Sequence, residues 1–160
     1  MYFCTTRSPI GKLLLAGDGE HLKLISFEAG RYSQPPQPDW TQDDKPFADV
    51  IQQLDEYFSG TRRRFDLPLQ PDGTPFQKTV WQALLDIPYG ATESYGTVAK
   101  RIGRPKAVRA VGLSNGRNPI PIVIPCHRVI GADGSLTGYG GGLWIKEQLL
   151  TLECTQRPLL

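Results

Sequence analysis

The chain has 160 residues, of which 39% are hydrophobic and 21% charged, and this composition excludes a wholly disordered protein. No apolar run approaches the roughly 18 residues of a membrane span, and the N-terminus lacks the basic-then-apolar order of a secretion signal. We therefore expect a cytoplasmic protein (nuclear if the source is eukaryotic) that does not bind membranes. The three cysteines are widely spaced without a CxxC pair, which argues against a disulfide framework.

Charge is distributed unevenly along the chain. Residues 1–70 carry 8 Lys/Arg and 10 Asp/Glu, a net charge of −2, whereas residues 71–160 carry 10 and 6, a net charge of +4. No acidic residue lies between Glu93 and Asp133. The cations in that stretch are Lys100, Arg101, Arg104, Lys106, Arg109, Arg117 and Arg128. Seven cations without a nearby acidic residue create a local positive field, as a surface that binds nucleic acid requires. Judged from charge alone, a solvated basic face without a partner is equally consistent.

The N-terminal half is predicted to be a mixture of strands and one helix. Apolar patterning in the first 28 residues, with a hairpin turn signal at residues 17–19, indicates short strands. Residues 33–46 contain four prolines and are expected to be a loop. Helical spacing of apolar residues predicts an amphipathic helix from Phe47 to Phe58, and residues 62–69 are consistent with one more strand. Prolines and a glycine then break the chain, so we expect domains at residues 1–70 and 71–160.

The second half carries mainly helix signals. Thr74, Pro75 and Gln77 form the pattern of an N-cap, a first-turn proline and a capping box. Further helices are expected over residues 95–102, 105–116 and 143–153, and a hairpin about Asp133-Gly134 over residues 129–139. Two short helices joined by a glycine-containing turn suggest a helix-turn-helix. The second of them is basic with several small residues, which allow close approach either to a partner or to another helix of the core.

Cys126 and His127 are a candidate nucleophile and base, because an imidazole can take the proton of a thiol directly or through one water. On a regular strand the two side chains would point to opposite faces, so the pair needs an irregular backbone, which Pro125 can help to set. The simpler alternative is a structural cysteine beside a surface histidine. Cys4 and Cys154 have no neighbouring base and are expected to be structural.

A productive pair needs a third group to orient the imidazole. Downstream carboxylates are Asp133, Glu147 and Glu153. Glu153 lies on the apolar stripe of the last helix, four and three residues after Leu149 and Leu150, so it is expected to be buried and to need a partner such as His127. Glu147 lies on a neighbouring stripe of the same helix, and spacing alone does not decide which of the two glutamates orients His127. Either of them is also consistent with a solvated glutamate that has no role in the site.

The run Pro125-Cys126-His127-Arg128-Val129 resembles the active-site motif of the O6-alkylguanine-DNA alkyltransferases, also called methylated-DNA–protein-cysteine methyltransferases. The resemblance is strong from about residue 74 to 153 and weaker before it, where Ser8-Pro9-Ile10-Gly11 matches best. Further matches in the family's order are Ser94-Tyr95-Gly96, Gly103-Arg104-Pro105, Arg109-Ala110-Val111-Gly112, Asn118-Pro119, Gly138-Tyr139, Gly141-Gly142, Lys146, Leu149-Leu150 and Glu153. Together these motifs are highly specific, whereas the first alone is not.

The resemblance implies an α/β (α+β) fold: a small N-terminal domain with a three-stranded antiparallel sheet and a helix, then a mostly helical domain with a helix-turn-helix. It implies a DNA repair protein that moves the alkyl group of O6-alkylguanine in double-stranded DNA irreversibly to its own cysteine, once, after the nucleotide is flipped out. No cofactor is implied. We expect a monomer, with several copies able to share one DNA. Some members carry zinc in the N-terminal domain, but only Cys4 and His21 are obvious soft ligands there, so no metal is expected.

The resemblance also implies roles for individual residues. In catalysis, Cys126 accepts the alkyl group, His127 deprotonates it through a water, Glu153 orients His127, Asn118 holds the turn, and Tyr95 assists the departing guanine. Base-binding residues are Val129, Tyr139 and Gly140, with the backbone of Cys126. DNA-binding residues are Tyr95, Gly96, Arg104, Val108, Arg109, Ala110 and Gly112, of which Arg109 fills the gap left by the flipped nucleotide while its helix lies in the minor groove.

Two alternatives belong to other classes. A DNA-binding module without chemistry, which recognises lesions or regulates genes, would show no transfer to Cys126. A Cys-His hydrolase or thiol redox protein would show several turnovers or a reversible disulfide, and it leaves the basic helix-turn-helix unexplained.

Overall fold

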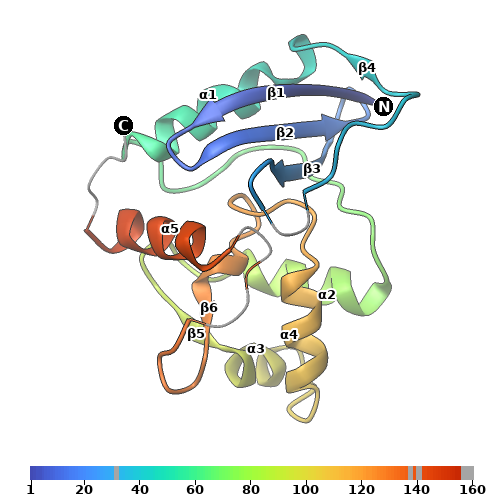
Figure 1. Cartoon of the computed structure of the whole chain (residues 1–160). Helices are drawn as coiled ribbons and strands as arrows, with labels where there is room; N and C mark the ends of the chain where they lie inside the picture. Colours follow the sequence, from blue (N-terminus) through green and yellow to red (C-terminus); the bar gives the residue numbers. More distant parts are fainter. Residues whose placement is uncertain (31–32, 137–138, 140–141, 156–160) are drawn as a thin grey trace.

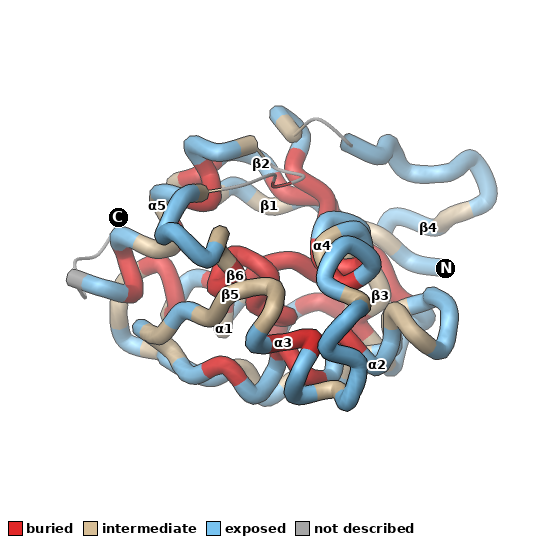
Figure 2. Tube along the Cα trace, turned by 90° about the horizontal axis from the view of Figure 1, so that it is seen from below, coloured by how far each residue is buried: buried red, intermediate tan, exposed pale blue. Residues whose placement is uncertain are grey.

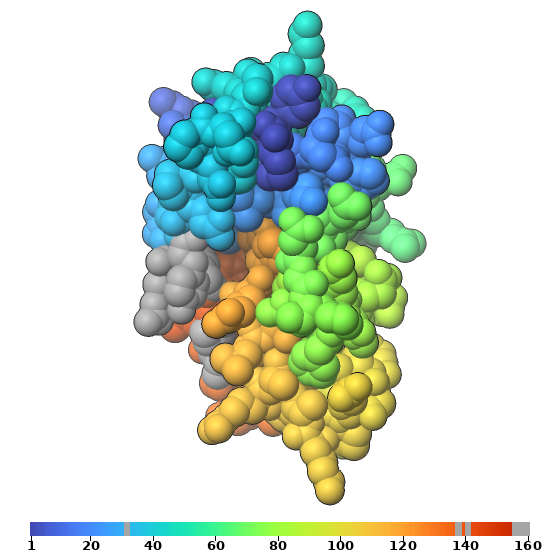
Figure 3. Space-filling model, turned by 90° about the vertical axis from the view of Figure 1, so that its right-hand side faces the viewer, coloured from blue at the N-terminus to red at the C-terminus, as the bar shows by residue number. Residues whose placement is uncertain are grey.

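The computed structural model describes residues 1–30, 33–136, 139 and 142–155. A sheet with one helix lies at one end of the molecule and a group of helices at the other, as Figure 1 shows. The space-filling view of Figure 3 shows the two halves of the sequence stacked one on the other, with the segment near residue 100 farthest from the sheet. Within the described residues, no helix has both the length and the apolar character to cross a bilayer.

A four-stranded sheet in the order β3-β2-β1-β4 forms the N-terminal half. Its strands are β1 (Tyr2–Ser8), β2 (Gly11–Gly17), β3 (Leu22–Phe27) and β4 (Thr41–Gln42). The first three pair antiparallel, as predicted, and β4 is parallel to β1. After β2 the chain turns back tightly, and a Cβ at Gly17 would lie 2.2 Å from the carbonyl oxygen of His21, so this turn needs a glycine.

The prediction of three strands was short by one, because β4 lies inside the proline-rich segment expected to be a loop. Proline cannot donate to a ladder, but the amides of Thr41 and Asp43 are free to do so. They donate to the carbonyl oxygens of Met1 and Phe3, each at 2.9 Å. The many prolines of this segment therefore led to the prediction of a loop where the chain forms a strand of two residues.

Helix α1 (Ala48–Phe58) follows a 3₁₀ turn, η1 (Lys45–Phe47), and lies beside β1 in Figure 1. The predicted helix has nearly these bounds. Its buried side chains are Val50, Leu54, Tyr57 and Phe58. This face packs into the core, which places the Tyr57 ring deep in the molecule, at 0% exposure.

The further strand expected over residues 62–69 does not form. An isolated parallel bridge joins Leu22 to Leu69, with Leu22 donating to Pro68 and accepting from Gln70. Prolines at 68 and 71 supply no amide donors, so the pairing cannot extend. On the same strand, the Ile25 amide donates to the carbonyl oxygen of Pro119 at 2.9 Å, so β3 also bonds directly to the C-terminal half.

The described part of the C-terminal half contains four α-helices: α2 (Pro75–Leu84), α3 (Tyr95–Arg101), α4 (Val108–Gly116) and α5 (Leu143–Thr155). The predicted capping box is present at the start of α2, where Thr74 and Gln77 exchange side-chain hydrogen bonds with each other's amides. Ser94 caps α3 by accepting from the Thr97 amide. The Trp81 indole on α2 donates to the carbonyl oxygen of Ser114 at 2.8 Å and so fixes α4 against α2.

Helices α3 and α4 form the predicted helix-turn-helix, but α4 begins three residues later than expected. Residues 104–107 form a turn, closed by the Ala107 amide donating to the Arg104 carbonyl at 2.9 Å. Pro105 occupies the second position of this turn, where its fixed φ is favoured. The proline predicted to start the helix therefore belongs to the connecting turn.

The hairpin expected over residues 129–139 lies only partly within the described residues, which contain its turn. The turn about Asp133-Gly134 exists, closed by the Gly131 amide and the Ser135 carbonyl at 2.9 Å. However, β6 (Val129–Ile130) pairs in parallel with β5 (Glu93–Ser94), and residues 137–138 lie outside the described residues. This pairing places β6 beside the segment that leads into α3.

Candidate active site

A wholly buried segment, residues 120–129, contains the candidate nucleophile and ends at β6, which lies beside red, buried chain in Figure 2. The Asn118 amide folds it back on itself: its nitrogen donates to the Ile124 carbonyl (2.8 Å) and its oxygen accepts from the Ile120 amide (3.0 Å). Ile122 has a φ of 75°, a region that β-branched residues rarely adopt. The surrounding contacts therefore hold this segment against its local preference.

The backbone is irregular at the Cys-His pair, as the sequence argument required. Residues Cys126–Arg128 form a 3₁₀ helix, η2, entered through Pro125 with φ −81° and ψ 63°. A 3₁₀ helix turns successive side chains by about 120°. Cys126 accordingly lines a cavity, while His127 and Arg128 reach into the core.

Glu153 of α5 is the carboxylate that meets His127, and Oε2 of Glu153 lies 2.6 Å from Nε2 of the imidazole. Arg128 binds the same carboxylate through Nε (2.7 Å to Oε1) and Nη2 (3.1 Å to Oε2). Tyr57 donates its hydroxyl to Oε2 at 2.6 Å. Glu147, the alternative, is exposed on the same helix. All four members of the Tyr57–His127–Arg128–Glu153 cluster are buried, so their charges interact through a medium of low polarity.

This cluster fixes the protonation of the imidazole. Burial alone raises the pKa of Glu153, but the contacts with His127 and Arg128 outweigh it and lower that pKa to about 2. An ionised carboxylate only accepts, so the hydrogen of neutral His127 lies on Nε2. Nδ1 is then the basic nitrogen, and it has no hydrogen-bond partner among the described residues. Burial lowers the pKa of His127, although Glu153 opposes that shift, so the ring is uncharged at neutral pH.

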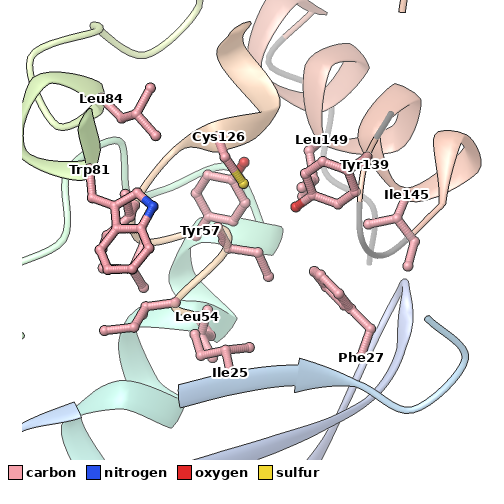
Figure 4. Packing of buried hydrophobic residues seen from close by; sticks show 14 of the residues in the cluster. Ile25, Phe27, Leu54, Tyr57, Trp81, Leu84, Cys126, Tyr139, Ile145 and Leu149 are labelled. Carbon is pink, nitrogen blue, oxygen red and sulfur yellow. The ribbon is translucent and has the colours of Figure 1, made fainter. Parts of the chain in front are cut away.

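The Cys126 thiol is protonated at rest. Burial raises its pKa, while Asn118, Lys146 and Tyr139 act in the opposite direction. Lys146 is fully buried and donates from Nζ to the Val129 carbonyl at 2.7 Å. Figure 4 shows Tyr139 and Tyr57 on either side of Cys126. A thiol in such a site becomes a nucleophile only when a base removes its proton.

A cavity of about 620 Å³ lies between β3 and the end of α4. Residues of its lining that carry polar groups include Asn115, Asn118, Cys126 and Tyr139. Asn115 donates to the Cys126 carbonyl at 3.2 Å, and the Val129 amide donates to the same oxygen. Cys126 therefore borders this cavity, and two hydrogen-bond donors hold its carbonyl oxygen in place. Gly140, predicted to bind the base, lies outside the described residues.

The predicted DNA-binding residues gather on the helix-turn-helix. Arg104, Val108, Arg109 and Ala110 are exposed there. A Cβ on Gly112 would lie 3.8 Å from the Tyr95 ring, an ordinary contact, so packing inside the protein does not require a glycine at this position. Gly112 faces Tyr95 of α3, whereas Ala110 is a small residue on the exposed side of α4. Gly96 and Tyr95 are partly exposed at the start of α3, next to this face.

Two of the seven cations predicted to form a surface field do not belong to it. Arg128 is buried and bound to Glu153, and its Nη1 donates to the Ile87 carbonyl at 2.7 Å. Arg101 forms an ion pair with Glu93 and donates to the Ala83 carbonyl. Counting charges along the sequence could not detect these pairings, because the partners are separated from the cations in the chain and meet only in the fold.

Sequence reasoning also missed Tyr57 and Asn115 as members of the site. Tyr57 appeared as one apolar position of an amphipathic helix, and nothing in that pattern marks its hydroxyl as a partner of Glu153, 96 residues away. Asn115 lies three residues before Asn118, and no pattern in the sequence marked it as a buried member of the site. Within the described residues, no three His, Cys, Asp or Glu side chains gather in a way that could hold a metal ion.

Two family models match the chain: 6-O-methylguanine DNA methyltransferase, ribonuclease-like domain, over residues 1–71, and 6-O-methylguanine DNA methyltransferase, DNA binding domain, over residues 75–155. The chain belongs to the 6-O-methylguanine DNA methyltransferase family. The family and the mixed α/β fold class predicted from the sequence are therefore confirmed.

Relatives in this methyltransferase family match over nearly their whole length. The methylated-DNA–protein-cysteine methyltransferase of Methanosarcina acetivorans is 54% identical over 153 residues, 96% of this chain and 98% of that protein. The one from Mycobacterium tuberculosis is 51% identical over 158 residues, 99% and 95% of the two chains. A crystal structure of the M. tuberculosis protein in complex with DNA superposes with a TM-score of 0.94 at 50% identity, covering 99% and 96% of the two chains.

Proposed function

We propose that this protein repairs O6-alkylguanine in double-stranded DNA by moving the alkyl group to Cys126, once per molecule and without a cofactor. The observation that carries the proposal is the position of the thiol: it lines a cavity and directly precedes a histidine that is bound to a buried carboxylate. The relatives' names, which describe transfer of a methyl group from DNA to a protein cysteine, support it.

In the proposed reaction, the Cys126 proton passes to Nδ1 of His127 through a water. The imidazolium that forms is stabilised by the ionised Glu153 on its other nitrogen. The thiolate then attacks the alkyl carbon, an S–C bond forms and the bond from carbon to the guanine 6-oxygen breaks. The departing guanine takes up one proton, for which Tyr95 provides a donor. A thioether cannot be cleaved by the same groups, so the protein is spent.

The DNA-binding part of the proposal places α4 in the minor groove. That groove is about 6 Å wide, and the small exposed side chain of Ala110 leaves α4 slender enough there to approach its floor. Arg109 is exposed on the same helix and replaces the flipped nucleotide in the stack. The exposed cations Lys100, Arg104, Lys106 and Arg117 provide phosphate contacts that do not depend on sequence.

We further propose that the chain folds as two domains, residues 1–70 and 71–160, and acts as a monomer in the cytoplasm, with several copies able to share one DNA. The two family models that match residues 1–71 and 75–155 support the boundary. Val129 and Tyr139 are proposed to bind the base together with Gly140, and Asn118 to keep the turn in place.

The test is the intact mass of the protein after incubation with a short duplex that contains one O6-methylguanine. We expect every active molecule to gain one methylene, located by peptide mapping on Cys126. Cys4 and Cys154 serve as internal controls in the same digest and should remain unmodified. Binding to the duplex without a gain in mass would instead favour a lesion-binding protein that performs no chemistry.

The rate of transfer should depend on pH through His127. Its pKa is lowered by burial below the ordinary value of 6.5, and a base whose pKa is lowered stays uncharged to more acidic pH. We therefore expect the single-turnover rate to be constant above pH 6.5 and to fall only below it, measured by rapid quenching between about pH 5 and 9. A rate that instead rises tenfold per pH unit throughout that range would show that solvent hydroxide, not His127, removes the thiol proton.

A further inference from the structure

One member of the buried cluster comes from the other half of the molecule. Tyr57 lies on α1, beside the N-terminal sheet, whereas His127, Arg128 and Glu153 all belong to the C-terminal half. Its hydroxyl donates to Oε2 of Glu153 at 2.6 Å, the same distance at which His127 Nε2 meets that same oxygen. The carboxylate oxygen that serves the candidate base is therefore shared with a residue of the N-terminal half.

The packing gives the Tyr57 hydroxyl little freedom. Its ring is 0% exposed and is enclosed by the aromatic rings of Phe58, Phe65 and Tyr89, with centroid distances of 5.4, 5.4 and 6.3 Å. Burial, together with Glu153, raises the pKa of Tyr57 well above 10, so the hydroxyl keeps its hydrogen and can only donate to the carboxylate. A hydroxyl that is held in one place and keeps its hydrogen can orient the Glu153 carboxylate, but it does not exchange protons with it.

We propose that Tyr57 is a positioning residue for alkyl transfer: its hydroxyl fixes the orientation of Glu153 and limits how strongly that carboxylate attracts the proton of His127. The inference rests on the function proposed above, because it assumes that His127 is the base. It makes the N-terminal half, which does not carry the helix-turn-helix, a part of the catalytic apparatus.

The proposed effect follows from how the donors share the carboxylate. Oε2 accepts from Tyr57, His127 and Nη2 of Arg128, while Oε1 accepts from Nε of Arg128. When the Tyr57 hydroxyl is removed, more of the negative charge on Oε2 is available to His127. The imidazolium is then stabilised, so the pKa of His127 rises, and the ring is protonated at a pH at which it should act as a base.

Other charged groups around His127 stay in place when Tyr57 is changed. Lys146 faces it from α5 and Arg128 from η2, and both act to lower the pKa of the imidazole, while Glu153 acts to raise it. Tyr89, next to Tyr57 and Arg128, is a further titratable neighbour of the carboxylate. The loss of the Tyr57 hydroxyl changes none of these groups. A shift in the pH profile of that variant can therefore be attributed to Tyr57.

The experiment compares Tyr57→Phe with Tyr89→Phe, which removes a hydroxyl from the adjacent ring. For Tyr57→Phe we expect the single-turnover rate at neutral pH to fall about tenfold, the scale of one hydrogen bond to a charged group, and the acidic limb of the profile to move to higher pH. For Tyr89→Phe we expect the rate at neutral pH and the position of the acidic limb to be the same as in the unmodified protein. Affinity for the methylated duplex should be unchanged in both variants, because neither ring lies on the helix-turn-helix.

Three results would overturn the inference: equal rates in the two variants, a lower rate with an unmoved acidic limb, or a parallel loss of DNA affinity. A lower melting temperature without a moved limb would mean that Tyr57 only supports the fold. The titration of the His127 imidazole followed by NMR reports the same shift independently of turnover. The proposed function fails in a different way, since the unmodified protein would then gain no mass from the methylated duplex.

Discussion

Replacement of Cys126 by alanine is expected to abolish methyl transfer completely and to leave binding to the methylated duplex in place. No other cysteine can substitute for it. Cys4 is buried in β1, and burial raises its pKa to about 11, so it is neither accessible nor ionised. Cys154 is exposed on α5 and is not part of the cavity lining. The thiol is a small buried side chain, so its truncation leaves the helix-turn-helix undisturbed. Intact mass and a binding titration on the same preparation measure both effects.

The matched control is Cys154→Ala, the same change at the exposed cysteine, which should transfer one methyl group per molecule at the unmodified rate. Transfer by Cys126→Ala to any other residue would show that the nucleophile has been misassigned. Loss of DNA affinity in Cys126→Ala would contradict the separation of the thiol from the DNA-binding face.

Features encoded by neighbouring residues could be predicted from the sequence. The capping box of Thr74 and Gln77 places the start of α2, because both partners lie within one helical turn. The bounds of α1 followed from the spacing of its apolar residues. The turn after α3 was harder to predict, because Pro105 suits the first turn of a helix and the second position of a β-turn equally well. The structure places it in the turn.

Features that depend on distant contacts could not be predicted in this way. Arg128 is one cation in an acid-free stretch of sequence, yet in the fold it neutralises a carboxylate of α5. Glu153 could be recognised as a buried acid with His127 as a candidate partner, but spacing alone did not separate it from Glu147. The pairing of β6 with β5 joins residues 129–130 to residues 93–94, and no local pattern specifies such a parallel contact. The resemblance to a family favoured Glu153 over Glu147, but it indicated neither the ion pair of Arg128 nor the pairing of β6 with β5.

Replacement of Glu153 by glutamine should both destabilise the protein and slow the reaction. The change leaves the buried guanidinium of Arg128 without a counter-charge, and removing one partner of a buried ion pair costs about 3–5 kcal/mol in the free energy of unfolding. It also removes the negative charge that stabilises the His127 imidazolium, so we expect the single-turnover rate to fall roughly a hundredfold. Urea denaturation and rapid quenching at neutral pH measure the two effects separately.

The stability effect carries a pH signature that identifies its origin. The pKa of Glu153 is lowered from its ordinary 4.5 to about 2 in the folded protein, so its stabilising contribution is complete above pH 4.5 and is lost as the pH falls through 2. The difference in unfolding free energy between Glu153→Gln and the unmodified protein should therefore shrink between pH 4.5 and 2, since protonation removes the same charge. Glu147→Gln makes the same change at an exposed position of α5 and should alter stability by no more than about 0.5 kcal/mol. A difference that stays constant down to pH 2 would mean that the carboxylate of Glu153 contributes through its shape rather than its charge, and would exclude an electrostatic role for this residue.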